Sequence, residues 1–485
     1  MGEVVVTETV PFEKIGSGRY RIPRHGKMRV DALFYASKEI LAGLETEEFA
    51  SLRQLINVAC LPGIVEPALA MPDIHWGYGF PIGGVAAFDA ASEGVVSPGG
   101  VGYDINCGVR LLASGLDRSD LGAHKKALAD ALYRLIPAGV GSKRRGEHLA
   151  PKELRRLLEQ GAAWMVGKGF GDEADLRYLE SGGVFANANP DTVSPRALER
   201  GAAQLGTLGS GNHFLEVQLV DRIFDRKAAE ALGLHLDQIT VLIHTGSRGL
   251  GHQVCSDYVG TFLKAAPRYG IDLPDRQLAA APIESSEGEA YLGAMAASAN
   301  FAFANRQRIT ASVRAAFEEI GFSPRDHGLR VVYDLAHNNA KFETHRGKKL
   351  LVHRKGATRA FGPGHAELPQ DYLNVGQPVF VPGDMGRYSF VLVGTDTAMR
   401  ETFGSSCHGA GRKMSRHRAK REARKRNLIE ELGEQGILIR AASRATVDEE
   451  MPEAYKDVAD VVDVVDTAGI GKKVARLRPL IVVKG

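Results

Sequence analysis

Glycine-rich segments constrain this chain more than any other feature of its sequence. Gly accounts for 56 of 485 residues, well above the usual share of about 7%. The clearest concentration is 71–114, MPDIHWGYGFPIGGVAAFDAASEGVVSPGGVGYDINCGVRLLAS, where short runs of β-branched residues alternate with Gly and Pro. This pattern is typical of strands joined by tight loops that carry functional groups.

Helices and further strands are expected around these loops. Apolar residues at three- and four-residue spacing predict helices within 119–165 and over 288–321. The pattern of segment 240–266 predicts a buried strand, a Gly-rich loop and a helix, and that of 329–339 predicts another strand. The region 350–397 predicts several strands, because its apolar runs are bounded by Gly or Pro.

Composition indicates a globular protein. Hydrophobic residues make up 44% and charged residues 25% of the chain, which excludes disordered and fibrous classes. No internal repeat or low-complexity linker divides the sequence, so we expect one catalytic domain over 1–485. Its expected class is mixed α/β (α+β), with a β-rich centre and helices outside.

Cytoplasmic localisation is expected from what the sequence lacks. No run approaches the roughly 18 apolar residues of a membrane span, and the N-terminal segment does not have the pattern of a signal peptide. Four cysteines in a chain of this length do not form a disulfide framework, so each is expected to be a buried apolar residue or a ligand.

A mixed set of ligand-type residues indicates a metal site. Asp104 and Cys107 lie three residues apart in GYDINCG. Four histidines occur where a predicted strand runs into a loop containing Gly, Ser or Asn, namely His213, His244, His337 and His408. Asp, Cys and three His suit Mn, Fe, Co or Zn better than Mg or Ca, and five ligands exceed the four of a structural zinc site. A thiolate that bridges two cations would make this a dinuclear centre.

Other interpretations of these residues stay open at this stage. A single histidine at a strand end is more often a hydrogen-bonded structural residue than a ligand, and the long spacing of this set follows no regular signature. Cys60 and Cys255 lie in apolar or helical contexts and are expected in the core. Cys407 is adjacent to His408 and remains a ligand candidate.

His408 is also a candidate nucleophile. In HGAGR (408–412) small residues let backbone N–H groups approach an anion, and Arg412 adds positive charge. A neutral imidazole attacks phosphorus without prior activation and forms a phosphoramidate. The sequence contains neither a G-x-x-x-x-G-K-S/T phosphate loop nor the Lys-x-Asp-Gly of lysine-adenylylating ligases.

The segment 412–426, RKMSRHRAKREARKR, is called here the basic segment. It carries nine Lys or Arg against one Glu, whereas the whole chain has a net charge of only +3. One interpretation is a solvated helix face, and the other is a surface that binds a polyanion. Its position beside His408 favours the second.

Together these motifs resemble those of the RtcB family of RNA-splicing ligases. The stretches that carry the resemblance, in order, are MPDIHWGYGFPIGG, GGVGYDINCGVR, GTLGSGNHFLEV, HTGSRGLGHQV, DLAHNNAKFE, HRKGATRAFGPG and SSCHGAGRKMSR, over about 71–415, and the closing VVKG is also similar. The resemblance implies that family's fold and a GTP- and Mn²⁺-dependent RNA ligase. Such an enzyme joins 2′,3′-cyclic-phosphate or 3′-phosphate RNA ends to 5′-hydroxyl ends in tRNA splicing or RNA repair, through a guanylylated histidine and an RNA-3′-pp-G intermediate.

The resemblance also implies roles for individual residues. One Mn²⁺ would be held by Asp104, Cys107 and His213 and a second by Cys107, His244 and His337. His408 matches the guanylylated histidine, and the further catalytic positions are Asp73, Asn212 and Arg248. The implied GTP contacts are Asn212, His213, Phe214, Leu215, Glu216, His337, Asn338, Pro382, Gly383, Asp384, Met385, Ser389, His408, Gly409, Ala410, Gly411 and Lys484. Asp384 departs from the family, where many relatives have Ser, and a carboxylate there could bond guanine but would repel phosphate.

Partners and alternatives follow from the same resemblance. It implies an RNA partner such as tRNA halves or cleaved RNA and no membrane contact, and it leaves open an activating partner of the archease type. A dinuclear metal phosphodiesterase would need the same ligands, and a noncatalytic RNA-binding protein could use the basic segment. Guanylylation of His408 distinguishes a ligase from both.

Overall fold

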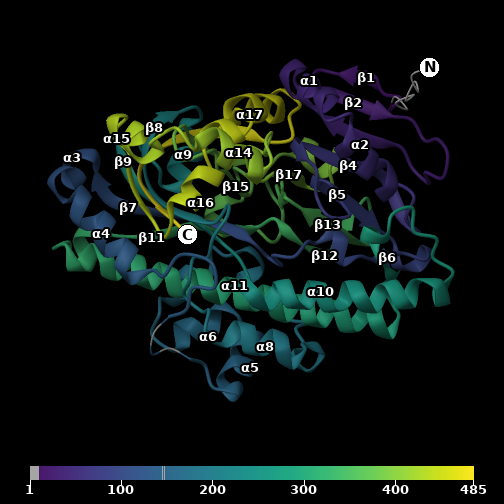
Figure 1. Ribbon diagram of the computed structural model, residues 1–485, viewed down its shortest axis with the longest axis horizontal. Helices are drawn as coiled ribbons and strands as arrows, with labels where there is room; N and C mark the ends of the chain where they lie inside the picture. The colour runs from purple at the N-terminus through teal and green to yellow at the C-terminus, as the bar shows by residue number, and fades with distance from the viewer. Residues whose placement is uncertain (1–9, 145, 147) are drawn as a thin grey trace.

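The computed structural model describes residues 10–144, 146 and 148–485. Within them, two large β-sheets form the centre and helices lie outside (Figure 1). This is the mixed α/β class with a β-rich centre that the sequence predicts. The largest cluster of buried apolar side chains extends from Val10 to Val483, so both ends of the described chain contribute to one core.

The first sheet contains seven of the described strands and lies toward the N-terminal side of the molecule (Figure 1). In spatial order its strands are β1 (Glu13–Gly16), β2 (Arg19–Ile22), β3 (Ala32–Tyr35), β4 (Ile64–His75), β5 (Ile82–Phe88), β13 (Lys348–Lys355) and β12 (Asn338–His345). Only the pair β3 and β4 is parallel, because helices α1 (Lys38–Thr46) and α2 (Ala50–Val58) carry the chain back between them.

The second sheet holds the central, most deeply buried strands. In spatial order they are β11 (Arg330–Ala336), β7 (Gly108–Asp117), β9 (Gln238–Thr245), β8 (Phe214–Ile223), β19 (Lys472–Lys484), β16 (Ser389–Val393) and β15 (Pro378–Val381), and β18 (Leu438–Ala441) pairs with β19. Every residue of β9 is buried, which explains its continuous apolar run. Two short ladders, β14 (Ala357–Arg359) with β17 (Ser405–Cys407) and β6 (Val95–Val96) with β10 (Ala281–Pro282), complete the described sheets.

One predicted strand is divided between the two sheets. The sequence predicts a single strand over 329–339, but β11 ends at Ala336 in the second sheet and β12 begins at Asn338 in the first. His337 lies at the crossing point. The single-strand prediction was wrong because Asn338 and Asn339 follow β11 almost directly in the sequence, and only their pairing with Lys355 and Arg354 of β13 assigns them to the first sheet.

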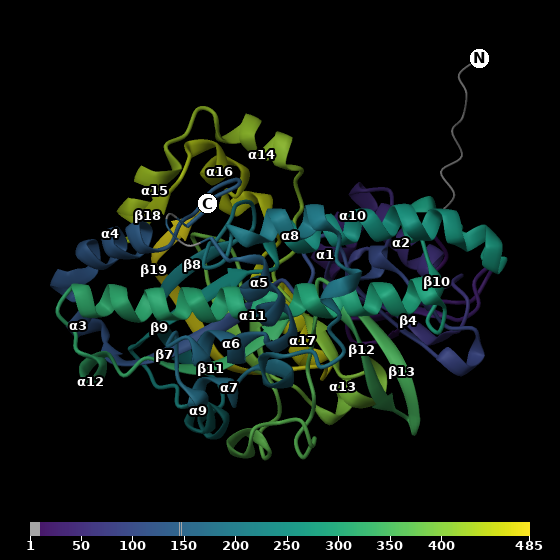
Figure 2. The same cartoon turned by 90° about the horizontal axis from the view of Figure 1, so that it is seen from below.

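Helices form two layers against one side of the sheets. The helix α10 (Arg248–Ala265) packs beside α11 (Ser286–Glu319), and α5 (Pro151–Gln160), α6 (Ala162–Gly167) and α8 (Pro195–Ala202) cover their outer side (Figures 1 and 2). The prediction of a helix over 288–321 is confirmed by α11. The other helices are α3 (Arg118–Leu121), α4 (Lys125–Leu135), α7 (Glu173–Leu176), α9 (Arg226–Leu232), α12 (Pro324–His327), α13 (Asp396–Glu401), α14 (Arg416–Ala423), α15 (Leu428–Glu434), α16 (Arg444–Glu449) and α17 (Val458–Thr467).

The long helix α11 is buried over most of its 34 residues. Its first half is rich in Ala, Gly and Ser, and such small side chains let neighbouring elements approach closely. Its middle carries buried polar residues that bind the backbone of loops. Asn305 accepts N–H bonds from Gly206 at 2.7 Å and Thr207 at 3.2 Å, and it donates to the carbonyl of Gly246 at 3.2 Å.

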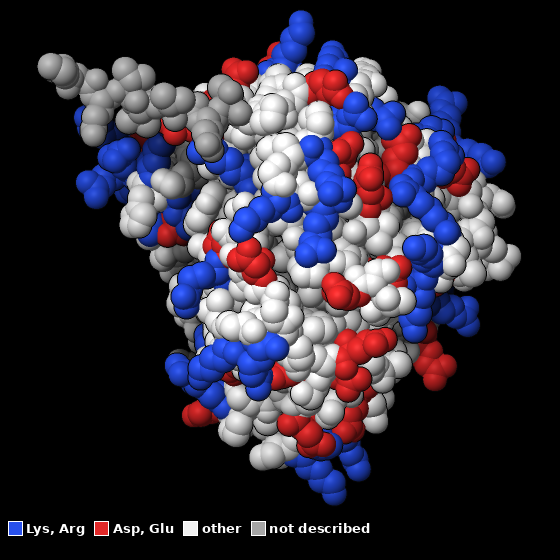
Figure 3. Space-filling view, turned by 90° about the vertical axis from the view of Figure 1, so that its right-hand side faces the viewer, with Lys and Arg blue, Asp and Glu red and all other residues white. Residues whose placement is uncertain are grey.

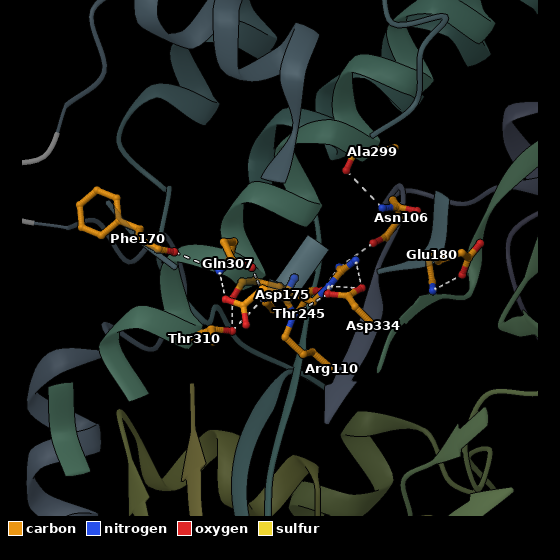
Figure 4. A network of polar contacts seen from close by, with 12 residues as sticks. Asn106, Arg110, Phe170, Asp175, Glu180, Thr245, Ala299, Gln307, Thr310 and Asp334 are labelled. Atoms are coloured by element: carbon orange, nitrogen blue, oxygen red, sulfur yellow. Dashed lines mark hydrogen bonds and ion pairs between the residues drawn. The ribbon is translucent and has the colours of Figure 1, made fainter. Parts of the chain in front are cut away.

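A buried ion cluster connects α11 to the central sheet (Figure 4). Arg110 on β7 donates to Asp334 on β11 at 2.7 Å, and Arg306 on α11 donates to the same carboxylate at 2.8 Å. All three side chains are fully buried. Arg306 also donates to the carbonyls of Asn106 at 3.0 Å and Thr245 at 2.9 Å, so this cluster fixes two loops at the ends of β7 and β9.

The surface shows no segregation of charge on the face drawn in Figure 3, where Lys and Arg are interspersed with Asp and Glu. This agrees with the small net charge of +3. Among the helices that the structure describes, none has the length and apolar character needed to cross a lipid bilayer.

The buried cluster leads to a stability prediction. Asp334→Asn leaves two buried guanidinium groups without a counter-charge, which should lower the free energy of unfolding by about 3–5 kcal/mol. Asp221→Asn is the matched control, because its pair with Arg476 is 17% and 25% exposed and should contribute no more than about 1 kcal/mol. Urea unfolding followed by circular dichroism measures both. Equal losses in the two variants would contradict the prediction.

Candidate functional site

Four strand ends meet at one end of the central sheet. Cys107 directly precedes β7, His213 directly precedes β8, His244 is the next-to-last residue of β9, and His337 follows β11. Strand pairing places the first residue of β7 opposite the last residues of β9 and β11, and the first residue of β8 opposite His244. Residues up to 230 positions apart in the chain, Cys107 and His337, therefore become neighbours.

Two groups of ligand-type atoms share Cys107. The first consists of Asp104, Cys107 and His213, the second of Cys107, His244 and His337, and the atoms of each group lie within 4.8 Å of one another. The Cys107 Sγ lies 3.4 Å from the Nε2 atoms of both His213 and His244. The His213 Nε2 lies 2.7 Å from Asp104 Oδ2, and the Nε2 atoms of His244 and His337 are 3.3 Å apart. The structure thus brings together all five residues of the expected ligand set.

The protonation states of these residues fit a cation. Burial lowers the pKa of His244 and His337 well below the ordinary value, so both imidazoles are neutral and carry a lone pair. Burial alone would raise the pKa of Asp104, but the adjacent His213 and Arg248 outweigh it and hold this pKa below its usual range. Burial and then Asp104 raise the pKa of the Cys107 thiol, and a bound cation would supply the charge that converts it to a thiolate.

The loop that carries Asp104 and Cys107 is held by close packing. Asn106 between them has a left-handed φ of 55°, and its carbonyl is the one that Arg306 binds. Asn338 donates to the Asp104 carbonyl at 3.1 Å. Opposite the loop, Gly246 is required, because a Cβ at this position would lie 2.4 Å from Asp104 Oδ1.

A pocket of about 330 Å³ opens beside the second group of ligands. His244 and His337 form part of its wall. Of the expected nucleotide contacts, those that line the pocket are Asn212, Phe214, Glu216, His337, Asn338, Pro382, Gly383, Asp384, Met385, His408, Gly409, Ala410, Gly411 and Lys484. Three lie off the pocket wall: His213 in the first ligand group, Leu215 in the core, and Ser389, which accepts a hydrogen bond from Gln218.

His408 is held by Asp73 at the pocket wall. The His408 Nδ1 lies 2.5 Å from Asp73 Oδ2, and the His408 backbone N–H donates to the same oxygen at 3.1 Å. The Nε2 atom has no hydrogen-bond partner in the described part of the chain, and the ring centroid lies 4.7 Å from that of His337. Gly411 makes this approach possible, since a Cβ there would lie 2.3 Å from the Asp73 carbonyl oxygen.

Several pocket residues were not expected from the sequence. Glu450 is almost fully buried, accepts a hydrogen bond from Arg412 at 3.1 Å, and lies 3.6 Å from the Lys484 ammonium. Tyr455 donates a hydrogen bond to Glu450. Both lie in 448–455, DEEMPEAY, which carries no recognisable motif; only the fold brings this segment to the pocket.

Asp384, which stands where many RtcB relatives are expected to have Ser, is bound by residues of its own turn. The carboxylate accepts N–H bonds from Gly386 at 3.0 Å and from Arg387 at 3.1 Å, and it pairs with the Arg387 guanidinium. Burial raises the pKa of Asp384, which Arg387 partly offsets. Most of its negative charge is therefore neutralised locally.

Arg248 lies beside the first ligand group. Its Nε lies 3.3 Å from the Thr207 hydroxyl and its Nη1 lies 3.5 Å from His213 Nδ1. Burial lowers the pKa of Arg248, and the neighbouring Asp104 acts in the opposite direction.

The basic segment contains α14, and acidic residues pair with part of it. Arg418 pairs with Glu422, Lys420 and Arg416 with Glu449, and Arg426 with Glu431. Arg421, Arg424 and Lys425 are exposed, and no described acidic residue forms an ion pair with them. The charge that the segment has available for a partner is therefore smaller than the sequence indicates.

Comparison with known proteins agrees with this arrangement. The sequence profile described as tRNA-splicing ligase RtcB matches residues 54–485. The chain is 54% identical over 481 residues to the tRNA-splicing ligase RtcB of Archaeoglobus fulgidus, covering 98% of this chain and 99% of the relative. It is 52% identical over 484 residues to that of Thermococcus kodakarensis, covering 99% of this chain and 100% of the relative. The chain belongs to the RtcB family. The RNA-splicing ligase RtcB of Mycobacterium tuberculosis is 50% identical over 437 residues, 89% of this chain and 100% of the relative.

The packing of Gly246 leads to a prediction about metal binding. Gly246→Ala should push the Asp104 carboxylate out of the first ligand group without unfolding the protein, because the atom it meets is the end of a side chain. We expect Mn²⁺ affinity to fall by at least about tenfold, measured by titration calorimetry. Gly260→Ala is the control, since a Cβ at that position on α10 meets nothing within 4 Å. Unchanged Mn²⁺ affinity in Gly246→Ala would remove Asp104 from the ligand set.

Proposed function

We propose that this chain is a GTP- and Mn²⁺-dependent ligase that joins RNA ends carrying a 2′,3′-cyclic phosphate or 3′-phosphate to 5′-hydroxyl ends, in tRNA splicing or RNA repair. The observation that carries the proposal is that His408, held by Asp73, lies in the wall of one pocket with His244 and His337 of the second ligand group. A phosphodiesterase would use the ligand groups but not this pair, and a noncatalytic RNA-binding protein would use neither.

His408 is the nucleophile in this proposal. Asp73 accepts a hydrogen bond from the Nδ1–H of His408 and so selects the tautomer whose Nε2 carries the lone pair. Nε2 attacks the α-phosphorus of GTP, so a P–N bond forms while the bond to the β-phosphate oxygen breaks and pyrophosphate leaves with the electron pair. Asp73 then stabilises the positive charge that the substituted ring acquires.

The proposed ligands of two Mn²⁺ ions are Asp104, Cys107 and His213 for one and Cys107, His244 and His337 for the other. Such ions would act as Lewis acids that stabilise charge on the transferring phosphoryl group. His213 donates its Nδ1 proton to the Leu208 carbonyl at 3.1 Å, which leaves Nε2 for the cation. Arg248 donates to the Thr207 hydroxyl at 3.3 Å beside this group.

The pocket wall supplies the groups for the nucleotide. Burial raises the pKa of Glu216 to about 8, so at neutral pH this carboxyl is largely protonated and can donate as well as accept a hydrogen bond. Lys484 and Arg412 bring positive charge that Glu450 partly offsets. We propose Asn212, Asn338 and the 409–411 backbone as further contacts, since all line the same pocket.

The remaining steps consume the adduct. Water attacks the phosphorus of a 2′,3′-cyclic phosphate, the bond from phosphorus to the 2′-oxygen breaks, and the 2′-oxygen takes up the proton, which leaves a 3′-phosphate. An oxygen of the 3′-phosphate then attacks the phosphorus of the His408 adduct, the P–N bond breaks, and RNA-3′-pp-G forms. The 5′-hydroxyl finally attacks the 3′-phosphorus, loses its proton and expels GMP. We propose the cytoplasm as the site of action, because Cys107 must remain reduced to serve as a ligand; all four cysteines are free.

Guanylylation tests the proposal directly. Incubation with radiolabelled GTP and Mn²⁺ should give an acid-labile, alkali-stable protein adduct, as expected for a phosphoramidate, and Mg²⁺ should support it poorly because it disfavours sulfur ligands. His408→Ala should abolish the label. His417→Ala, an exposed histidine on α14, is the control and should retain it. Persistent label in His408→Ala would refute the assignment of the nucleophile.

The basic segment has its own test. If it follows the RNA backbone, Arg421→Gln with Arg424→Gln should weaken binding of single-stranded RNA and reduce the slope of log K against log salt by about 0.7 for each lost phosphate contact. The control changes Arg418 and Lys420, whose acidic partners already offset their charge, and should have a smaller effect. Guanylylation should survive in both variants. An unchanged slope in the first variant would identify the segment as a solvated helix face.

A further inference from the structure

Trp76 is the most exposed large aromatic side chain of the described residues, with 60% of its surface accessible. It follows β4 directly and lines the same pocket as His408. No described aromatic ring stacks on it, and the ring contacts of this region join Tyr78 to Tyr103 and Tyr103 to His252. A ring of this size left in water at the rim of a functional pocket indicates a binding role.

Side-chain hydrogen bonds from three residues hold the backbone of the loop that follows Trp76. Gln54 binds Gly77 twice, donating to its carbonyl at 2.6 Å and accepting from its N–H at 3.0 Å. Gln277 accepts from the Gly79 N–H at 3.0 Å. Lys355, itself 3% exposed, donates to the carbonyls of Tyr78 and of Phe80, the latter at 3.1 Å. The backbone that follows Trp76 is therefore held in place before any ligand binds, which lowers the entropy lost on binding.

A second aromatic group continues from this loop to the first ligand group. The Tyr78 and Tyr103 rings are 5.3 Å apart between centroids, and Tyr103 and His252 are 4.8 Å apart. Tyr103 directly precedes Asp104 in the chain. His252 lies on α10 one turn after Arg248, so both side chains occupy the same face of that helix. These rings are therefore adjacent in the chain or on α10 to Asp104 and Arg248, beside the first ligand group.

We propose that Trp76 stacks on an unpaired base next to the RNA end that reacts at His408, and that Tyr103 and His252 extend this stacking surface. The inference rests on the proposed function, since a 3′-phosphate that takes GMP from His408 must bring its neighbouring nucleotides across the rim where Trp76 lies. Stacking on aromatic side chains accepts any base and suits single-stranded ends. Arg412, Arg416 and Lys484 line the same pocket. Glu449 and Glu450 offset part of their charge, and the remainder would favour a polyanion over an apolar protein segment.

Affinity for RNA is the first measurement. Wild type and variants are titrated with a short single-stranded RNA carrying a 3′-phosphate and a fluorescent 5′ label. Trp76→Leu should bind about 5-fold to 100-fold more weakly, whereas Trp76→Phe keeps an aromatic face and should lose much less. Phe342→Leu is the matched control: Phe342 is 43% exposed and lies outside the His408 pocket. Unchanged RNA affinity in Trp76→Leu would overturn the proposal and leave the indole as a contact for a protein partner.

Abasic RNA distinguishes stacking from a general loss of packing. Removing one base near the 3′ end should weaken binding to wild type by about the factor seen for Trp76→Leu, and the same abasic RNA should bind Trp76→Leu no more weakly than intact RNA does. Additive losses at every abasic position would contradict a Trp76–base contact.

Intrinsic fluorescence provides a direct readout. The chain has two tryptophans, and Trp164 is only 8% exposed. In a Trp164→Phe background, emission from Trp76 should be quenched on addition of RNA but not on addition of GTP. Quenching by GTP alone would reassign the indole to the guanine of the nucleotide.

Guanylylation of His408 separates this inference from the proposed function. If wild type forms no GMP adduct, the ligase proposal itself fails. If wild type and Trp76→Leu are labelled equally but bind RNA equally well, only the stacking proposal fails. The expected result is equal labelling within about twofold, with RNA binding lost in Trp76→Leu alone.

Discussion

The buried contact between Asp334 and two arginines is the interaction on which the rest of the structure depends. Arg110, Arg306 and Asp334 come from a strand, a helix and a second strand, and none is accessible to water. Placing these charges in the core carries a large desolvation penalty, which the contacts of Asp334 with Arg110 Nε and with Nε and Nη2 of Arg306 offset. In return Arg306 has donors left for the carbonyls of Asn106 and Thr245. The backbone beside Cys107 and His244 is therefore positioned from inside the protein.

Histidine acquires two different chemical roles through its surroundings. Near Cys107, burial keeps His244 and His337 neutral and their Nε2 atoms converge, which suits cation binding. At the pocket wall, His408 has a carboxylate on Nδ1 and leaves Nε2 without a partner, which suits nucleophilic attack. The rings of His337 and His408 are nevertheless only 4.7 Å apart between centroids. The histidine proposed to bind a cation is therefore adjacent to the histidine proposed to attack phosphorus.

The proposed RNA-binding residues are of two kinds, the cations of the basic segment and the aromatic rings near Trp76. Fewer of the cations are unpaired than the sequence indicates, and more aromatic surface is exposed. Glu449 pairs with Arg416 and Lys420 of the basic segment, and Glu431 pairs with Arg426. Exposed rings lie at Trp76 and across Tyr103 and His252. Phosphate attraction is long-ranged and indifferent to geometry, whereas stacking requires a ring held at a defined place. The hydrogen bonds that hold the backbone after Trp76 help to keep its ring in a defined place.

The sequence by itself determined the class of fold, the main elements and the identity of the ligand-type residues, because these depend on local spacing and on side-chain chemistry. It indicated α11 from its helical periodicity and Asp104 with Cys107 from their place in a Gly-rich loop. Only the tertiary structure decided that β11 and β12 separate at His337, that Glu450 and Tyr455 reach the pocket, and that acidic partners offset much of the basic segment. Each of these depends on contacts between residues far apart in the chain, and local sequence carries no signal for the partner that folding brings to them.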